Sequence, residues 1–178
     1  MKFIVPAILA AAMAMPAAAT TLRITITNDQ ANNGFALTPV YTAFHNGDFD
    51  SYDPGVAATP GLEALAEVGN FGPIRDERIA ATTGNGNPST GAVFSSFTPD
   101  GGRRPLFGGE SATVDVDITN IATQRYFSFL SMVIPTNDLF VGNGNPFAFE
   151  LFDAMGDRAQ YLEVTEENGT SAVENVHV

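Results

Sequence analysis

The sequence predicts an all-β fold, an antiparallel β-sandwich with one short helix. Short segments with the two-residue alternation of half-buried strands recur along the chain, and Gly, Asn, Pro and Asp residues separate them. A single segment has the pattern of a helix, and there is no internal repeat and no linker that would divide the chain into two domains. Many short strands with frequent turn residues are typical of a sandwich.

The first half of the chain contains two predicted strands and the helix. Residues 22–27 (LRITIT) alternate apolar and polar side chains, and residues 40–45 (VYTAFH) are the second strand candidate. Residues 60–70 start with proline, continue with strong helix formers and end with Gly-Asn, the pattern of a short helix. Because this helix has barely two turns, its apolar side chains must pack on the rest of the protein to stabilise it. Those side chains are Leu62, Leu65 and Val68.

The second half supplies the remaining predicted strands. The continuous apolar run 126–134 fits a central strand that is buried on both faces, with Phe129 and Val133 in the core. Pro135 has no N–H to donate, so strand pairing should end there and Asp138 should lie in a loop at the rim of the sandwich. The other expected strands are residues 91–95, 112–118, 146–152 and 161–165.

The N-terminus has the pattern of a secretory signal peptide. Lys2 supplies the positive charge, residues 3–15 are apolar, and Ala17-Ala18-Ala19 offers small residues for cleavage. We expect cleavage after Ala19, so that residues 1–19 are the signal peptide and residues 20–178 form one domain. No later stretch has the roughly 18 consecutive apolar residues of a membrane span. The expected location is periplasmic or extracellular.

Composition excludes several classes of function. The 178-residue chain has a net charge of −12, which becomes −13 without Lys2 because residues 1–19 contain no acid. Nucleic acid is not an expected partner, since phosphate binding requires clustered basic residues. The absence of cysteine excludes thiol catalysis, thiolate metal sites and disulfides.

Motifs for catalysis are missing as well. The only histidines are His45 and His177, and the sequence has no nucleophile elbow, no HExxH, no P-loop and no GxGxxG. A Ser-His-Asp triad could be assembled by the fold around His45, but nothing in the local sequence favours it. We therefore expect His45 to be a structural residue and the protein not to be an enzyme.

Carboxylates suggest a bound cation. Asp115 and Asp117 share one side of their predicted strand, and that side normally faces solvent. Asp117 lies close to the strand end, where it could approach a rim loop. Carboxylates that are gathered without a cation repel one another, and Ca²⁺ is the ion that accepts many oxygen ligands from irregular loops.

Three stretches together resemble the spondin N-terminal domain family in its bacterial, signal-peptide-bearing form. The first is Leu37–His45 with Ala58–Gly69, the second is Gly108–Val114, and the third is Ser131–Gly142, which resembles the family's SMxxPSPDWFVG segment. Their order and spacing cover most of residues 22–152.

The resemblance implies a C2-like β-sandwich that is used for adhesion and matrix binding, with a calcium ion at one rim and no catalysis. Asp138 matches the aspartate of the family's PDW stretch, a metal ligand, and an acid on the preceding strand maps to Asp117. The family's DAGTD/E stretch has its best counterpart in Glu167-Asn168-Gly169-Thr170, with Ser171 in place of the final acid. The expected calcium ligands are thus Asp138, Asp117 and Glu167.

The leading hypothesis is a secreted, calcium-binding, non-catalytic module that binds an extracellular or cell-surface protein or glycan. The alternative is a metal-independent structural or assembly protein of the cell surface, in which the chain associates with itself. A secreted hydrolase that uses His45 is the third hypothesis.

Overall fold

The computed structural model of the chain describes residues 19–153, 156–157, 164–165 and 173–177. Most of them lie in β-strands, and the described residues contain two helices, α1 (Pro60–Val68) and α2 (Gly72–Gly84). The strands are β1 (Thr20–Thr27), β2 (Ala36–Leu37), β3 (Val40–His45), β4 (Thr90–Phe94), β5 (Ser96–Phe97), β6 (Arg103–Arg104), β7 (Ser111–Ile118), β8 (Tyr126–Ile134), β9 (Phe140–Gly142), β10 (Phe149–Glu150), β11 (Val164–Thr165) and β12 (Val173–His177).

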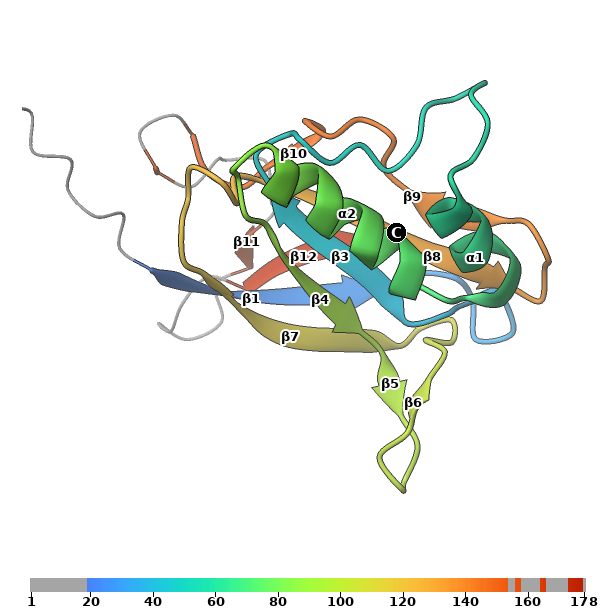
Figure 1. Ribbon diagram of the computed structural model, residues 1–178. Helices are drawn as coiled ribbons and strands as arrows, with labels where there is room; N and C mark the ends of the chain where they lie inside the picture. The colour runs from blue at the N-terminus through green and yellow to red at the C-terminus, as the bar shows by residue number, and fades with distance from the viewer. Residues whose placement is uncertain (1–18, 154–155, 158–163, 166–172, 178) are drawn as a thin grey trace, which may run out of the picture.

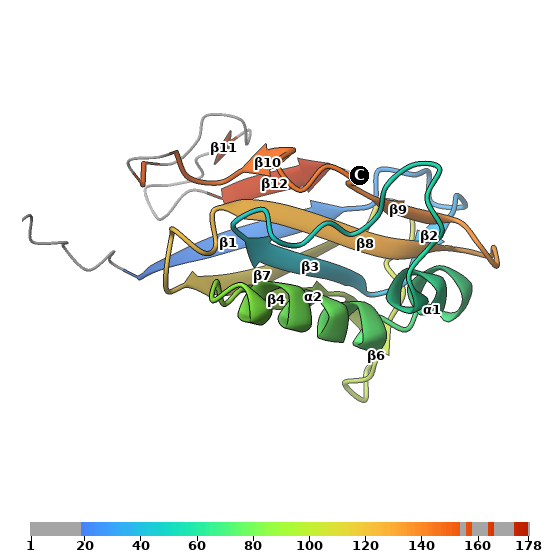
Figure 2. The same cartoon turned by 45° about the horizontal axis from the view of Figure 1, so that its top comes forward.

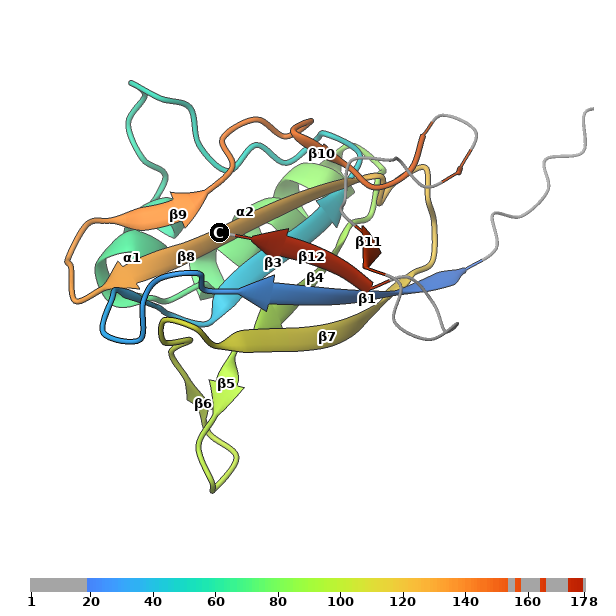
Figure 3. The same ribbon diagram turned by 180° about the vertical axis from the view of Figure 1, so that it is seen from behind.

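Two main sheets form the body of the molecule. One has four strands in the order β11-β12-β1-β7, and the other has the order β10-β8-β3-β4, with β2 and β9 also paired to β8. Strands β5 and β6 form a separate two-stranded hairpin. Figures 1 and 3 show the hairpin extending away from the body, below β4 and β7.

The main core lies between the two large sheets. Ile24 from β1 and Val116 from β7 belong to the same buried cluster as Phe44, Phe127 and Phe129 from β3 and β8. Burial of such aromatic side chains is the largest favourable contribution to folding. This packing fixes which ends of the strands become neighbours.

The two helices cover the opposite face of the sheet that contains β3 and β8. Leu62 and Leu65 of α1 and Ile74 of α2 pack with Tyr41 and Leu130 in a second buried cluster. Val68, which was expected to pack as well, is exposed, so that expectation was wrong. Figure 2 shows both helices on one side of this sheet, with β1 and β7 on the other side. Strands β3 and β8 are therefore buried on both faces, which confirms the interpretation of residues 126–134 as a central strand.

Capping explains why α1 begins and ends where the sequence predicts. Thr59 accepts a hydrogen bond from the Leu62 N–H at 3.2 Å, and Pro60 occupies the first turn. At the other end, Gly69 adopts the left-handed conformation with φ 65°, and its N–H donates to the carbonyl oxygen of Leu65 at 3.0 Å.

The expectation of one short helix was wrong, because α2 is a second helix. Its buried residues are Ile74, Arg78 and Thr82, one per turn, so the face it turns to the sheet contains only one apolar side chain. Hydrophobic periodicity is absent from such a helix. Arg78 instead donates to the Tyr41 hydroxyl at 2.6 Å and to Ser89.

A second difference concerns strand direction. The expected sheets were antiparallel, and most pairings are, but β12 runs parallel to β1, with Ile24 opposite Glu174. Of the last two expected strands, residues 146–152 form a strand only at 149–150, and residues 161–165 are described only at 164–165.

Within the described residues, neither helix is both long and apolar enough to cross a membrane.

Candidate functional site

Asp138 lies in the connection between β8 and β9, as predicted. Strand β8 ends at Ile134, directly before Pro135, and the Asp138 side chain is exposed. In this turn Thr136 donates to the carbonyl oxygen of Val133, and the Leu139 N–H donates to the Thr136 hydroxyl at 3.3 Å. The turn thus presents Asp138 to solvent.

Asp115 and Asp117 lie on the solvent face of β7, also as predicted for Asp115. The Asp115 carboxylate accepts two hydrogen bonds from Arg23 on β1, at 2.7 and 2.8 Å. Arg23 lowers the pKa of the Asp115 carboxyl, chiefly through these hydrogen bonds. Asp117 accepts a hydrogen bond from the Thr21 hydroxyl at 2.7 Å. Each of the two carboxylates thus already has a partner on β1.

The structure does not bring Asp117 and Asp138 together. Asp117 precedes the loop that enters β8 at Tyr126, and Asp138 follows the other end of this nine-residue strand. At about 3.3 Å per residue, the two ends of β8 are roughly 26 Å apart. Figure 3 shows the β7–β8 connection and the β8–β9 turn at opposite ends of the strand.

The predicted calcium ligands therefore do not form one site among the described residues. In the part of the chain that the structure describes, no group of three or more His, Asp or Glu side chains is arranged to hold a metal ion. The third expected ligand, Glu167, lies outside the described residues. Asp117 and Asp138 cannot bind the same ion in this fold.

His45 is completely buried and belongs to a hydrogen-bond network. Its Nδ1 accepts from the Gly47 N–H at 3.0 Å, and its Nε2 lies 2.9 Å from the Ser128 hydroxyl oxygen. The Asn143 side-chain amide also donates to that hydroxyl oxygen, at 3.1 Å. With Nδ1 acting as acceptor, the neutral ring carries its proton on Nε2 and donates it to Ser128.

This arrangement differs from a Ser-His-Asp triad. In a triad the serine donates to Nε2, and a carboxylate accepts from Nδ1. Here the backbone N–H of Gly47 occupies the position of the carboxylate. Burial and, secondarily, the positive charge of Arg78 lower the pKa of His45 to about 4. His45 therefore connects β3 to β8 and to the loop that follows β3.

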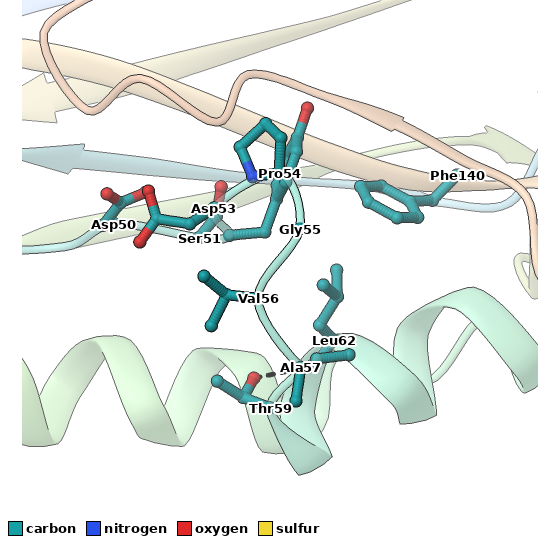
Figure 4. A pocket seen from close by; sticks show the side chains of 12 residues that line it. Asp50, Ser51, Asp53, Pro54, Gly55, Val56, Ala57, Thr59, Leu62 and Phe140 are labelled. Atoms are coloured by element: carbon teal, nitrogen blue, oxygen red, sulfur yellow. Dashed lines mark hydrogen bonds between the residues drawn. The ribbon is translucent and has the colours of Figure 1, made fainter.

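A pocket of about 360 Å³ lies between the loop that follows β3, the start of α1 and strand β9. Figure 4 shows Leu62 and Phe140 on one side of it and the chain of residues 50–57 on the other. The Phe140 ring meets the Tyr52 ring edge to face, with 5.0 Å between centroids. Pockets for small ligands usually have volumes of about 300–1,000 Å³.

The pocket combines an apolar wall with two carboxylates. Asp50 and Asp53 line it together with Leu62, Phe140 and the exposed Val56. Partial desolvation and, secondarily, the nearby charge of Asp53 raise the pKa of Asp50. Such a pocket suits a positively charged group that is attached to an apolar one, because the cation removes the repulsion between the carboxylates.

Hydrogen bonds from α2 fix one edge of the pocket. Glu77 accepts from the Thr59 hydroxyl and from the Gly61 N–H, both at 2.7 Å. These bonds hold the first turn of α1 against α2 at the place where the loop joins the helix. On the other side, the Ser51 hydroxyl donates to the Asn143 carbonyl oxygen at 2.9 Å. The two ends of the loop are thus anchored, although residues 53–59 are exposed.

Sequence reasoning did not identify this pocket. The available signal was the group of acidic and aromatic residues in 48–53 (DFDSYD), to which no function had been assigned. The hydrogen bonds of Glu110 were not expected either, although the Gly108–Val114 stretch was recognised. Glu110 accepts hydrogen bonds from Arg104, Ser96 and the Phe107 N–H.

No protein-family model matches the chain. No curated protein matches it either.

Proposed function

We propose that this protein is an exported, non-catalytic C2-like β-sandwich module, similar to spondin N-terminal domains, that binds a protein or glycan outside the cytoplasm. The pocket beside α1 and β9 is the proposed binding site. Its ligand would present a positively charged group next to an apolar one, as a basic side chain of a protein or an amino sugar does.

One observation carries the proposal. Two of the three stretches that resemble the spondin family meet at this pocket: Thr59 and Leu62 come from the first stretch, and Phe140 comes from the third. Elsewhere the same stretches are joined by the Thr38 N–H, which donates to the Met132 carbonyl oxygen at 3.0 Å. Residues about 80 positions apart in the sequence thus share one surface, which is what a binding site built by the motifs requires.

The position of His45 supports a binding role over hydrolysis. A general base must reach the proton that it abstracts in a substrate. The His45 ring is fully buried, and its two nitrogens are occupied by Gly47 and Ser128. Burial also lowers the pKa of His45 to about 4, so the ring is neutral at neutral pH.

The proposal is tested with the purified chain 20–178 and a panel of matrix proteins and glycans. We expect saturable binding to one class of ligand, and weaker binding by the Asp53→Ala variant, which removes an exposed carboxylate of the pocket. Glu67→Ala, which removes an exposed carboxylate of α1 outside the pocket, is the matched control. Absence of saturable binding, together with hydrolytic activity that depends on His45, would overturn the proposal.

Calcium binding is a separate component of the proposal, and it depends on Asp138 and Glu167. An ion that binds only the folded state raises the melting temperature. We expect CaCl₂ to raise the melting temperature of the wild-type chain and of Asp117→Ala, but not that of Asp138→Ala. Equal responses of the wild type and Asp138→Ala would remove calcium from the proposal and leave the pocket unaffected.

A further inference from the structure

The β5–β6 hairpin is an arm with a closed tip. Residues 98–102 connect its strands, and the Thr98 N–H and hydroxyl both donate to the Gly102 carbonyl oxygen, at 2.8 and 3.0 Å. Figures 1 and 3 show the arm outside the two main sheets. A two-stranded hairpin is marginally stable in isolation, so other contacts must fix its position.

Glu110 provides those contacts on one face of the arm. Ser96 and Arg104 are opposite each other in the hairpin, so their side chains share a face. The Glu110 carboxylate accepts two hydrogen bonds from the Arg104 guanidinium, both at 2.8 Å, and one from the Ser96 hydroxyl at 3.2 Å. Both strands of the arm are therefore bound to the start of β7.

The other face of the arm presents a cation next to an aromatic ring. Phe97 and Arg103 are also directly opposite each other, which places their Cβ atoms about 5 Å apart on the same face. Phe97 is 60 % exposed, and Arg103 is exposed. Among the described residues, Arg103 is the one basic side chain without a hydrogen bond or ion pair. Within the part of the chain that the structure describes, no ion pair or side-chain hydrogen bond engages this pair.

The pocket beside α1 has the complementary chemistry. Leu62 and Phe140 form an apolar wall that can receive an aromatic ring, and Asp50 and Asp53 can receive a guanidinium. Arginine pairs well with carboxylates because its planar group offers several donors in a fixed geometry. Neither of these two aspartates has an ion pair within the described residues.

We propose that Phe97 and Arg103 of one copy of this chain occupy the pocket of a second copy. Within one copy the two surfaces cannot meet, because Figures 1, 2 and 3 show the arm and the loop before α1 on opposite sides of the body. The contact is therefore head to tail, and each bound copy still offers a free arm and a free pocket. Such heterologous contacts produce rings or open filaments rather than closed dimers.

The charge of the chain sets the conditions for association. Two copies of residues 20–178, each with a net charge of −13 once Lys2 is removed from the −12 of the full chain, repel each other at long range. At physiological ionic strength this repulsion is screened beyond about 8 Å, whereas the contact between Arg103 and the two aspartates is shorter than that. A contact formed by one short arm is small, so we expect dissociation constants in the micromolar range or weaker.

The inference uses the pocket of the proposed function, but its test needs only the purified chain 20–178. Sedimentation velocity is measured over increasing protein concentration at physiological salt. We expect the wild type to form oligomers larger than dimers. The arm variant Phe97→Ser with Arg103→Ser and the pocket variant Asp50→Asn with Asp53→Asn should each remain monomeric, with circular dichroism spectra like that of the wild type.

Mixing the two variants gives the decisive result. The intact arm of the pocket variant fits the intact pocket of the arm variant, so the mixture should form one-to-one dimers and nothing larger. Ile79→Ser, which removes a 44 % exposed apolar side chain from α2, should leave association unchanged. Wild-type monomers at every concentration, a mixture that stays monomeric, or loss of association in Ile79→Ser would each overturn the inference. A failed ligand panel would not affect it.

Discussion

Acidification from pH 7 to pH 5 should destabilise this protein through the buried side chain of His45. The ring is fully buried and neutral, and its pKa in the folded state is lowered to about 4 from 6.5. Well above pH 6.5 the ring is neutral in both the folded and the unfolded state, so it makes no contribution to the pH dependence. As the pH falls below that value, the unfolded state binds a proton that the folded state does not bind.

The magnitude follows from the two pKa values. Each pH unit between them is worth about 1.4 kcal/mol. The free energy of unfolding should therefore decrease by about 2 kcal/mol between pH 6.5 and about pH 5, and by about 3 kcal/mol at pH 4. The loss is complete once the pH falls below the folded-state pKa. A change of this size is a large fraction of the stability of a typical domain.

The assay is urea denaturation followed by circular dichroism at several pH values between 7 and 5. His45→Gln retains an amide that can donate to Ser128 but does not titrate, so its stability should vary less with pH than that of the wild type. His177→Gln is the control, because His177 is the other histidine of the chain. Equal pH dependence in the wild type and His45→Gln would refute the reasoning, as would an ordinary pKa for His45 in an NMR titration.

Two further variants test the segment that holds the arm. In Gly108→Ala the added Cβ would lie 2.1 Å from a neighbouring backbone carbonyl oxygen, so we expect the free energy of unfolding, measured by urea denaturation, to fall by about 1–3 kcal/mol. Gly84→Ala is the control: its added Cβ has no atom within 4 Å, so the free energy of unfolding should fall much less. Glu110→Gln should speed hydrogen exchange of the amides in 96–104, and Glu67→Gln should not. The hydrogen bonds from Arg104 are the largest cause of the low pKa of Glu110, which falls from 4.5 to about 2. In the wild type, the protection of these amides from exchange should therefore be present above pH 4.5 and be lost as the pH falls toward 2.

Local pattern was sufficient for the elements that carry their own signals. Strands 40–45 and 126–134 were predicted with the bounds that the structure has, and α1 was predicted to within two residues of its end. In each case the information lies in neighbouring residues: a short run of β-forming residues at 40–45, a continuous apolar run before Pro135, and a Thr59–Pro60 start with a Gly69 stop. The exposed positions of Asp115 and Asp138 followed from the same patterns.

Other features depended on contacts between distant residues and were missed. Helix α2 turns Arg78 and Thr82 toward the sheet, where Tyr41 and Ser89 supply hydrogen-bond partners from outside the helix. The parallel pairing of β12 with β1 likewise depends on where the chain returns after residue 165. Neither feature has a local periodicity by which it could be predicted.

By itself the sequence determined the all-β class, the central strands, the first helix and the acidic character of the chain. The tertiary structure alone decided which charged groups become neighbours. It separated Asp117 from Asp138 by the length of β8, and it placed Asp50 and Asp53 beside Phe140 and Arg103 beside Phe97. The physical reason is that side-chain alternation specifies a face of a strand, whereas proximity depends on the order and direction in which the strands pair.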